Sequence, residues 1–205
     1  MPRHKVRNLI LASIALLCLG FTGAAVYSLI FVPESLQVEI GGPFALQDTE
    51  GREVTEASFL GRHLLIYFGY TYCPDVCPTR LQEMSVALDE LETRDPALAA
   101  AVVPLFVTVD PKRDTAAALK AYAAHFHPRL QALRGSEAEV IDLVGSYQGY
   151  VKYMPAEDGA DYLIDHPAYV YLVGPDGRYV THFTTFQGPE DMVERLLRLT
   201  SDRAG

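Results

Sequence analysis

The feature that most constrains how this chain folds is a pair of cysteines between two prolines, placed where an apolar run ends. Residues 64–70 are apolar and aromatic and predict a buried strand, and Cys73-Pro-Asp-Val-Cys77-Pro follows it closely. The first proline disfavours helical backbone at Cys73, whereas the second is tolerated in the first turn of a helix. The sequence therefore predicts a strand that passes into a helix, with Asp75 or Cys77 as the N-cap. Ligands and chemistry collect at such carboxyl ends of strands in α/β sheets.

The spacing of the two cysteines suits a metal ion at least as well as a disulfide. Residues four apart at a helix start have Cβ atoms about 5–6 Å apart, whereas a disulfide needs about 3.5–4.5 Å. One metal ion bridges the larger separation, although a disulfide could form after local relaxation. Cys77 also lies near the positive end of the helix dipole, which favours a thiolate. A metal clip, a redox dithiol and a structural disulfide all stay open on this evidence.

Composition and charge narrow the class of protein. With 49% hydrophobic residues the chain can build a core without staples, and three cysteines are too few for a disulfide scaffold. One of them, Cys18, lies in an N-terminal apolar segment, where we interpret it as an ordinary apolar side chain. Residues 33–205 carry 26 acidic and 14 basic side chains, a net charge of −12, because three of the 17 basic residues precede them. This acidity argues against a nucleic-acid partner and is compatible with a cationic protein surface.

The N-terminal segment predicts a membrane anchor. Residues 1–8 form a short basic flank, and residues 9–32 carry no charge. A helix of that length spans a hydrocarbon core of about 30 Å, whereas the apolar part of a cleaved signal peptide is usually only about 7–15 residues. We therefore expect an uncleaved, single-pass anchor with the N-terminus in the cytoplasm. The flank is too short for a mitochondrial transit peptide, so the expected location is a bacterial inner membrane with the domain in the periplasm.

The rest of the chain predicts one α/β domain at residues 44–200, after a linker at 33–43 and before a tail at 201–205. Strands are expected at 63–70, 101–109 and 130–133, and helices at 78–94, 115–126, 136–147 and from Pro189 onward, with Asp114 and Ser136 as N-caps. Hairpins are expected at 44–54 and 168–183, and an extended loop or hairpin at 149–165. The alternation implies a mixed central sheet flanked by helices, with an antiparallel closing edge. A strand followed by a dithiol and a helix in this order is a thioredoxin-like arrangement.

A third metal ligand is expected at His166. It lies in Ile164-Asp165-His166-Pro167, just before an apolar strand, and in a thioredoxin-like fold that junction lies beside the dithiol. The other histidines belong to the basic flank, strand starts, a helix end or an alternating strand. Two sulfurs and one imidazole suit Cu(I) and can also hold Cu(II), whereas zinc normally needs a fourth ligand. The predicted metal is copper, held by Cys73, Cys77 and His166.

These residues belong to a wider set of motifs, and with them the chain resembles the Sco (SenC/PrrC) family of membrane-anchored copper proteins that assist cytochrome c oxidase assembly. The resemblance covers about residues 41–199. The motifs that carry it are Gly42-Pro43-Phe44, Tyr67-Phe-Gly-Tyr-Thr, Cys73-Pro-Asp-Val-Cys77-Pro, Val107-Thr-Val-Asp110-Pro-Lys-Arg113-Asp114-Thr115, Asp161-Tyr162-Leu-Ile-Asp165-His166 and Tyr171-Leu-Val-Gly-Pro-Asp-Gly177.

The resemblance implies a thioredoxin-like domain that binds one copper through the three ligands. Such a protein passes copper to the binuclear copper site of cytochrome c oxidase subunit II, or keeps the cysteines of that site reduced, and would itself receive copper from a periplasmic donor. Supporting roles are assigned to Asp75, Asp110, Arg113, Asp114 and Asp165. A helix cap with a salt bridge is the alternative interpretation of the central three.

Two departures from the family pattern stand out. Tyr72 occupies a position where members often have His, which removes an extra donor but no expected ligand. Pro167 follows the predicted ligand histidine, where Ser or Thr is more usual in the family. A proline at this position fixes the backbone, for example through a cis peptide bond.

The sequence also leaves a second function open, that of a thiol–disulfide oxidoreductase acting on a partner's cysteines. That function needs both thiols but not His166. The two roles are compatible because metal binding requires the reduced dithiol. Whether the protein is an enzyme is therefore undecided by the sequence, and a peroxidase is a distant third possibility.

Overall fold

The computed structural model describes residues 3–30, 39–155 and 162–201 and divides into two compact units, residues 1–38 and 39–205. The first unit consists of helix α1 (Arg3–Ile30), on which apolar side chains such as Leu16, Leu19 and Phe21 are exposed. No helix in the described ranges is both long enough and apolar enough to cross a membrane, so the span predicted at 9–32 is not confirmed. Parts of the predicted linker (33–38) and tail (202–205) lie outside the described residues.

The second unit is built on a mixed sheet of seven strands in the order β2-β1-β5-β4-β3-β8-β9. Strand β3 (His63–Gly69) pairs in parallel with β4 (Val102–Thr108), which pairs in parallel with β5 (Gln131–Arg134). On its other side β3 pairs antiparallel with β8 (Val170–Val173). Every residue of β3, β4 and β8 is buried, which explains their continuous apolar sequences.

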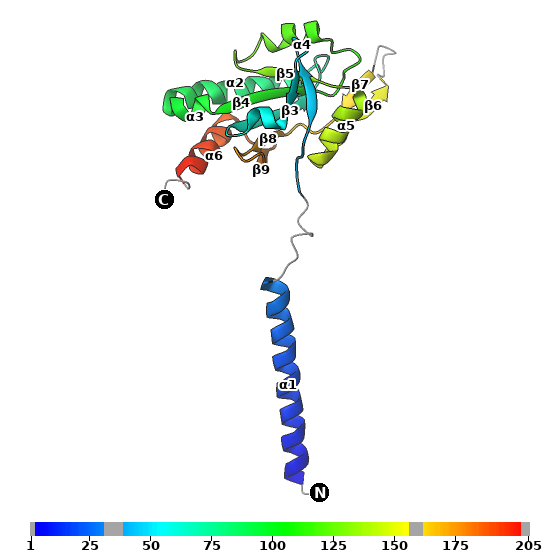
Figure 1. Ribbon diagram of the computed structural model, residues 1–205, viewed down its shortest axis with the longest axis vertical. Coiled ribbons are helices and arrows are strands. Elements are labelled where there is room, and N and C mark those ends of the chain that lie inside the picture. Colours follow the sequence, from blue (N-terminus) through cyan, green and yellow to red (C-terminus); the bar gives the residue numbers. More distant parts are fainter. Residues whose placement is uncertain (1–2, 31–38, 156–161, 202–205) are drawn as a thin grey trace. The chain divides into compact units, whose positions relative to one another are not determined.

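Antiparallel strands complete the sheet and add a small hairpin. Strands β1 (Ala45–Asp48) and β2 (Glu53–Thr55) form one edge, and β9 (Tyr179–Phe183) forms the other. Strands β6 (Lys152–Pro155) and β7 (Tyr162–Asp165) make a separate two-stranded sheet, so the segment predicted as a loop or hairpin is a hairpin. Figure 1 shows this hairpin next to α5, at the end of the domain away from α3. Residues 156–161 between its strands lie outside the described residues.

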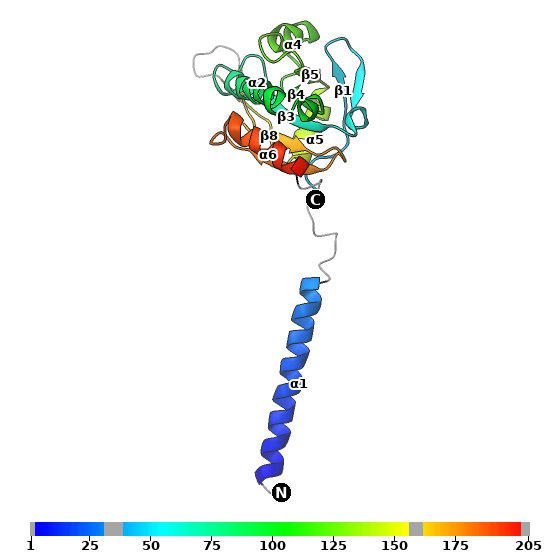
Figure 2. The same ribbon diagram turned by 90° about the vertical axis from the view of Figure 1, so that its left-hand side faces the viewer.

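Helices cover both faces of the sheet. Helix α2 (Val76–Arg94) packs beside α6 (Pro189–Ser201), as the two ribbon views agree (Figures 1 and 2). Helix α4 (Ala116–Ala123) covers the same face, because Tyr122 on α4 packs on Phe106 of β4, which stacks on Tyr67 of β3. Helix α5 (Glu137–Ser146) covers the other face, where Tyr147 packs on Phe68. Successive side chains of β3 thus point to opposite faces of the sheet, and the strand contributes to a layer of core on each face.

The helix starts follow the sequence signals with one exception. Asp75 is the N-cap of α2, and Ser136 and Glu139 form the predicted capping box of α5. The N-cap of α4 is Thr115, whose hydroxyl accepts from the Ala118 N–H, so the prediction of Asp114 as that cap is wrong. The short helices η2 (Glu56–Phe59) and α3 (Pro96–Ala100) were not predicted, because each is little more than one turn and lacks a periodic apolar face. The fold is thioredoxin-like α/β with a mixed central sheet.

Candidate metal centre

The structure brings Cys73, Cys77 and His166 together from three parts of the chain. Their ligand atoms all lie within 4.8 Å of one another, and Cys77 Sγ is 3.5 Å from His166 Nε2. Cys73 lies in the loop after β3, Cys77 in the first turn of α2, and His166 directly after β7. The group sits at the carboxyl end of β3, where the sequence placed it.

The two cysteines are free thiols with different surroundings. Cys77 is buried and its backbone N–H donates to Cys73 Sγ at 3.4 Å, whereas Cys73 is half-buried. The hydrogen bond from the Cys77 thiol, with further help from the backbone N–H groups of Asp75 and Cys77, lowers the pKa of Cys73 to about 4 against the opposing effect of burial. The shared hydrogen bond with Cys73, together with burial, raises the pKa of Cys77. Cys73 is therefore the thiolate of the pair and Cys77 the thiol.

His166 turns its Nε2 toward the sulfurs. Its Nδ1 lies 3.1 Å from the carbonyl oxygen of Pro167, which can only accept, so Nδ1 carries the proton and the Nε2 lone pair faces Cys77. The rings of Tyr67 and Tyr70 contact the imidazole edge-on, with centroids 6.2 and 5.7 Å away. The tautomer with the proton on Nδ1 and the lone pair on Nε2 is the one that a ligating imidazole needs. The residues described contain no cis peptide, so the suggestion of a cis bond before Pro167 is wrong.

The backbone leaves room for the Cys77 sulfur. A Cβ built on Gly69, the last residue of β3, would lie 3.0 Å from Cys77 Sγ and 2.8 Å from Tyr67 Cε1. Only glycine fits this close approach. Two thiols and a correctly oriented imidazole form a soft donor set that fits Cu(I), and the same set accepts Cu(II).

Asp114 fixes the loop that leads to Cys73. Its carboxylate accepts from the backbone N–H of Thr71 at 3.1 Å, from the Thr71 hydroxyl, and from the Thr108 hydroxyl at the end of β4. The side chain is fully buried, and this burial raises its pKa despite those donors. Asp114 therefore holds the β3–α2 loop against β4 instead of capping α4.

Asp110, Arg113 and Tyr162 join the loop after β4 to strand β7. Arg113 forms an ion pair with the buried Asp110, and Tyr162 Oη donates to Asp110 Oδ1 at 2.8 Å. Arg113 Nη1 donates to the Tyr162 carbonyl oxygen at 3.0 Å, and its guanidinium lies 3.7 Å from the centre of the Tyr162 ring. Because β7 leads directly into His166, these contacts position the histidine. Sequence reasoning missed this role of Tyr162, although the residue stands in a motif that it singled out.

Asp75 and Asp165 adjoin the ligands in sequence, but their carboxylates are exposed and lie outside the group of ligand atoms. Asp75 acts through its backbone as the N-cap of α2, with no side-chain cap hydrogen bond. Asp165 accepts from Tyr150 Oη at 3.1 Å. The contacts of both residues are therefore local to the backbone on either side of the three-residue group.

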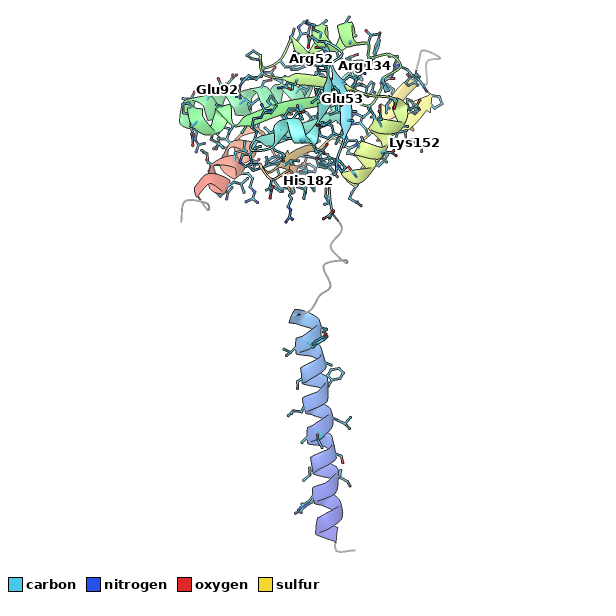
Figure 3. All side chains as sticks on the ribbon, viewed as in Figure 1. Arg52, Glu53, Glu92, Arg134, Lys152 and His182 are labelled. Carbon is cyan, nitrogen blue, oxygen red and sulfur yellow. The ribbon has the colours of Figure 1, made fainter. Side chains whose placement is uncertain are left out.

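A second group with metal-ligating side chains, Asp89, Glu92 and His127, lies elsewhere on the domain. The backbone N–H of Arg129 donates to His127 Nδ1 at 3.2 Å, so in the neutral ring the proton is on Nε2. That nitrogen lies 3.6 Å from Asp89 and 3.4 Å from Glu92, close enough for electrostatic contact. Figure 3 places Glu92 at the end of the domain opposite Lys152 of the β6–β7 hairpin. In this tautomer the Nε2–H points its proton at the two carboxylates and offers no lone pair to a metal, so we assign no metal to this group.

Comparison with known proteins decides the family. A profile of the SCO1/SenC family matches residues 32–201. The chain belongs to the SCO1/SenC family. A structure of Bradyrhizobium japonicum ScoI with copper bound is 44% identical, covers 78% of this chain and 98% of that one, and superposes with a TM-score of 0.69. Arabidopsis thaliana ScoI with copper bound is 35% identical, with coverage of 78% and 99% and a TM-score of 0.72.

The family also includes mitochondrial proteins. The bovine mitochondrial SCO2 homologue is 39% identical over 163 residues, which are 79% of this chain and 60% of that protein. The chain thus spans only part of the length of this mitochondrial relative. The match to the family covers the folded domain, including all three members of the Cys73, Cys77 and His166 group.

Proposed function

We propose that this SCO1/SenC protein binds one copper ion through Cys73, Cys77 and His166. The observation that carries the proposal is the orientation of His166, whose Nε2 lone pair faces two sulfurs within 4.8 Å while Nδ1 is held by a carbonyl. The thiolate of Cys73, and the sulfur of Cys77 once its thiol loses the proton to solvent on binding, would supply the soft, negatively charged donors that Cu(I) prefers. Family members with copper bound support the choice of metal.

The physiological role that fits such a site is copper delivery. The protein would carry copper from a periplasmic donor to the binuclear copper site of cytochrome c oxidase subunit II, or keep the cysteines of that site reduced, during assembly of the oxidase. A half-exposed Cys73 above a buried Cys77 supports transfer, because an incoming thiolate can reach the copper on the side of Cys73.

The test of the copper site is anaerobic titration of the reduced, full-length chain in detergent with Cu(I) against a competing chelator. The wild-type protein is expected to bind one copper per chain, and Cys73→Ser, Cys77→Ser and His166→Ala are each expected to lose tight binding while staying folded. Tight binding that is indifferent to His166→Ala would contradict the three-ligand site.

A thiol–disulfide oxidoreductase is the second candidate, and the Cys73 thiolate favours it. A pKa of about 4 keeps this half-exposed sulfur ionised at neutral pH, and the buried Cys77 thiol beside it can act as the resolving partner. Reduction of a disulfide peptide by the metal-free protein tests this function. Disulfide reduction that survives His166→Ala but not Cys77→Ser would favour the reductase. Loss of both copper binding and disulfide reduction in His166→Ala would favour copper delivery.

We further propose that the N-terminal segment attaches the domain to a bacterial inner membrane, with the N-terminus in the cytoplasm and the domain in the periplasm. The support is in the sequence, which has 24 uncharged residues at 9–32 after a basic flank. Carbonate extraction of membranes that contain the full chain, with protease applied to spheroplasts, tests both parts. A chain that carbonate releases, or a domain that protease cannot reach, would contradict them.

A further inference from the structure

The hydroxyl of Tyr67 is a buried donor that makes no hydrogen bond of normal geometry to any described residue of the metal-free domain. Tyr67 lies in the middle of β3 and is completely buried, and its Oη has no hydrogen-bond partner within the described part of the chain. Buried hydroxyls nearly always have a partner, because an unsatisfied one is destabilising. The orphaned hydroxyl therefore calls for an explanation.

The tyrosine lies against two of the three proposed ligands. A Cβ built on Gly69 would lie 2.8 Å from Tyr67 Cε1 and 3.0 Å from Cys77 Sγ. The edge of the Tyr67 ring and the Cys77 sulfur therefore both pack against Gly69. The ring also contacts the imidazole of His166 edge-on. Burial raises the pKa of Tyr67, and the charge of Cys77 and its side-chain hydrogen bonding raise it further. The hydroxyl therefore already lies close to the Cys77 sulfur in the metal-free domain, although no hydrogen bond of normal geometry joins the two atoms.

We infer that Tyr67 is a positioning residue of the metal centre, whose hydroxyl donates a hydrogen bond to the Cys77 sulfur when that sulfur is a metal-bound thiolate. This inference rests on the proposed copper site. In the metal-free protein the Cys77 thiol faces His166 Nε2, and a neutral thiol is a weak acceptor. Metal binding occupies Nε2 and releases the thiol proton to solvent, which turns the sulfur into an anionic acceptor beside an unused donor. Charge-assisted hydrogen bonds are the stronger kind, so loading satisfies Tyr67 and the metal-free state leaves it unpaired.

Tyr122 provides a matched control. Its hydroxyl is likewise buried, with no hydrogen-bond partner among the residues that the structure describes, and its ring likewise packs on Phe106. Burial and the charges of Cys77 and Cys73 raise its pKa, without a hydrogen-bond contribution from either sulfur. Tyr122→Phe therefore removes the same atom from a similar environment without touching the proposed contact.

The experiment compares wild-type protein, Tyr67→Phe and Tyr122→Phe as full-length chains in detergent. Tyr67→Phe is expected to lower Cu(I) affinity by about 10- to 100-fold, the range for partners that orient metal ligands, and to shift the thiolate-to-Cu(II) charge-transfer band. The metal-free Tyr67→Phe protein should melt at the wild-type temperature or above it, because the variant removes an unpaired hydroxyl. Tyr122→Phe should match the wild type in affinity and spectrum.

Equal affinity and an unchanged charge-transfer band in Tyr67→Phe would overturn the inference while leaving the copper site intact. If the wild-type protein binds no copper, the proposed function fails and this inference fails with it. Should the variant fold poorly, proton NMR of the wild-type protein decides. Diamagnetic Cu(I) is expected to shift a slowly exchanging Tyr67 hydroxyl proton and give it a cross-peak to the Cys77 methylene, and the absence of both would overturn the inference.

Discussion

His166 Nε2 lies 3.5 Å from Cys77 Sγ, although 89 residues separate the two in the chain. Two separate sets of contacts maintain this approach. Asp114 holds the loop before the cysteines to the end of β4, and the Asp110–Arg113–Tyr162 group holds β7 to the loop after β4. Both sets are anchored in residues 108–114, so one short segment positions the cysteine side and the histidine side of the site.

Removing the Tyr162 hydroxyl should loosen the histidine side. Tyr162→Phe deletes the donor to the buried Asp110 carboxylate while it keeps the ring under Arg113. We expect a loss of about 1–3 kcal/mol in the free energy of unfolding, measured with urea, and weaker Cu(I) binding. Tyr150→Phe is the control, because its hydroxyl meets the exposed Asp165 and should cost less than about 0.5 kcal/mol. Equal effects of the two variants would contradict a positioning role for Tyr162.

Gly69→Ala should disturb the packing of the Cys77 sulfur. The added methyl would lie 3.0 Å from both Cys77 Sγ and Phe106 Cε2, and overpacking of this kind typically costs about 1–3 kcal/mol. The measurement is thermal unfolding together with Cu(I) affinity, and both should fall. Gly145→Ala in α5 is the matched control, since a Cβ built there meets no described residue beyond its own helix within 4 Å, and the helix should gain about 0.5–1 kcal/mol. A Gly69→Ala protein as stable as Gly145→Ala would refute this account of the close approach.

The Cys73 thiol should stay reactive in mildly acidic solution. Its pKa of about 4 predicts that the rate of alkylation by iodoacetamide stays constant from pH 8 down to about pH 5. An ordinary thiol is already protonated, and therefore slow to react, at a pH well above 5. Mass spectrometry of the reduced, metal-free protein should locate the label on Cys73 and not on Cys77. In Cys77→Ala, which removes the donor, the profile should move to higher pH, because the hydrogen bond from the Cys77 thiol is the largest stabiliser of the Cys73 thiolate. A wild-type midpoint near pH 8–9 would contradict the assignment.

Asp114 should make the stability of the domain fall as pH rises. Burial raises its pKa above the usual value of 3.8, so the folded state holds this proton more tightly than the unfolded chain. The contribution of Asp114 is therefore complete below that value and is lost as pH increases through the raised pKa. In urea titrations the stability of wild type relative to Asp114→Asn should decline from pH 4 to pH 7.

Glu139 supplies a control of opposite sign for that experiment. The Ser136 backbone N–H lowers the pKa of Glu139, so stability relative to Glu139→Gln should rise over the lowest part of the same pH range. Parallel trends in the two comparisons would show that the pH dependence does not come from these carboxylates.

Local sequence signals were enough to predict most of the fold, because the strands at β3 and β4 are continuous apolar runs and the capping box at Ser136 is a short-range motif. The grouping of Cys73, Cys77 and His166 was also within reach, because the predicted fold places the start of β8 beside the dithiol. The role of Asp114 was not. Its hydrogen bonds go to Thr71 and Thr108, and nothing in the spacing distinguishes a carboxylate that caps its own helix from one that turns to another strand.

The histidine and the cysteines come from segments far apart, and this has a consequence for the whole chain. A metal held only by Cys73 and Cys77 closes a ring of a few residues, whereas one that also holds His166 ties together positions 89 residues apart. Closing a long loop removes more freedom from the unfolded chain than closing a short one. Copper bound by all three ligands would thus act as a reversible crosslink, and its binding or release would change the free energy of unfolding of the entire domain.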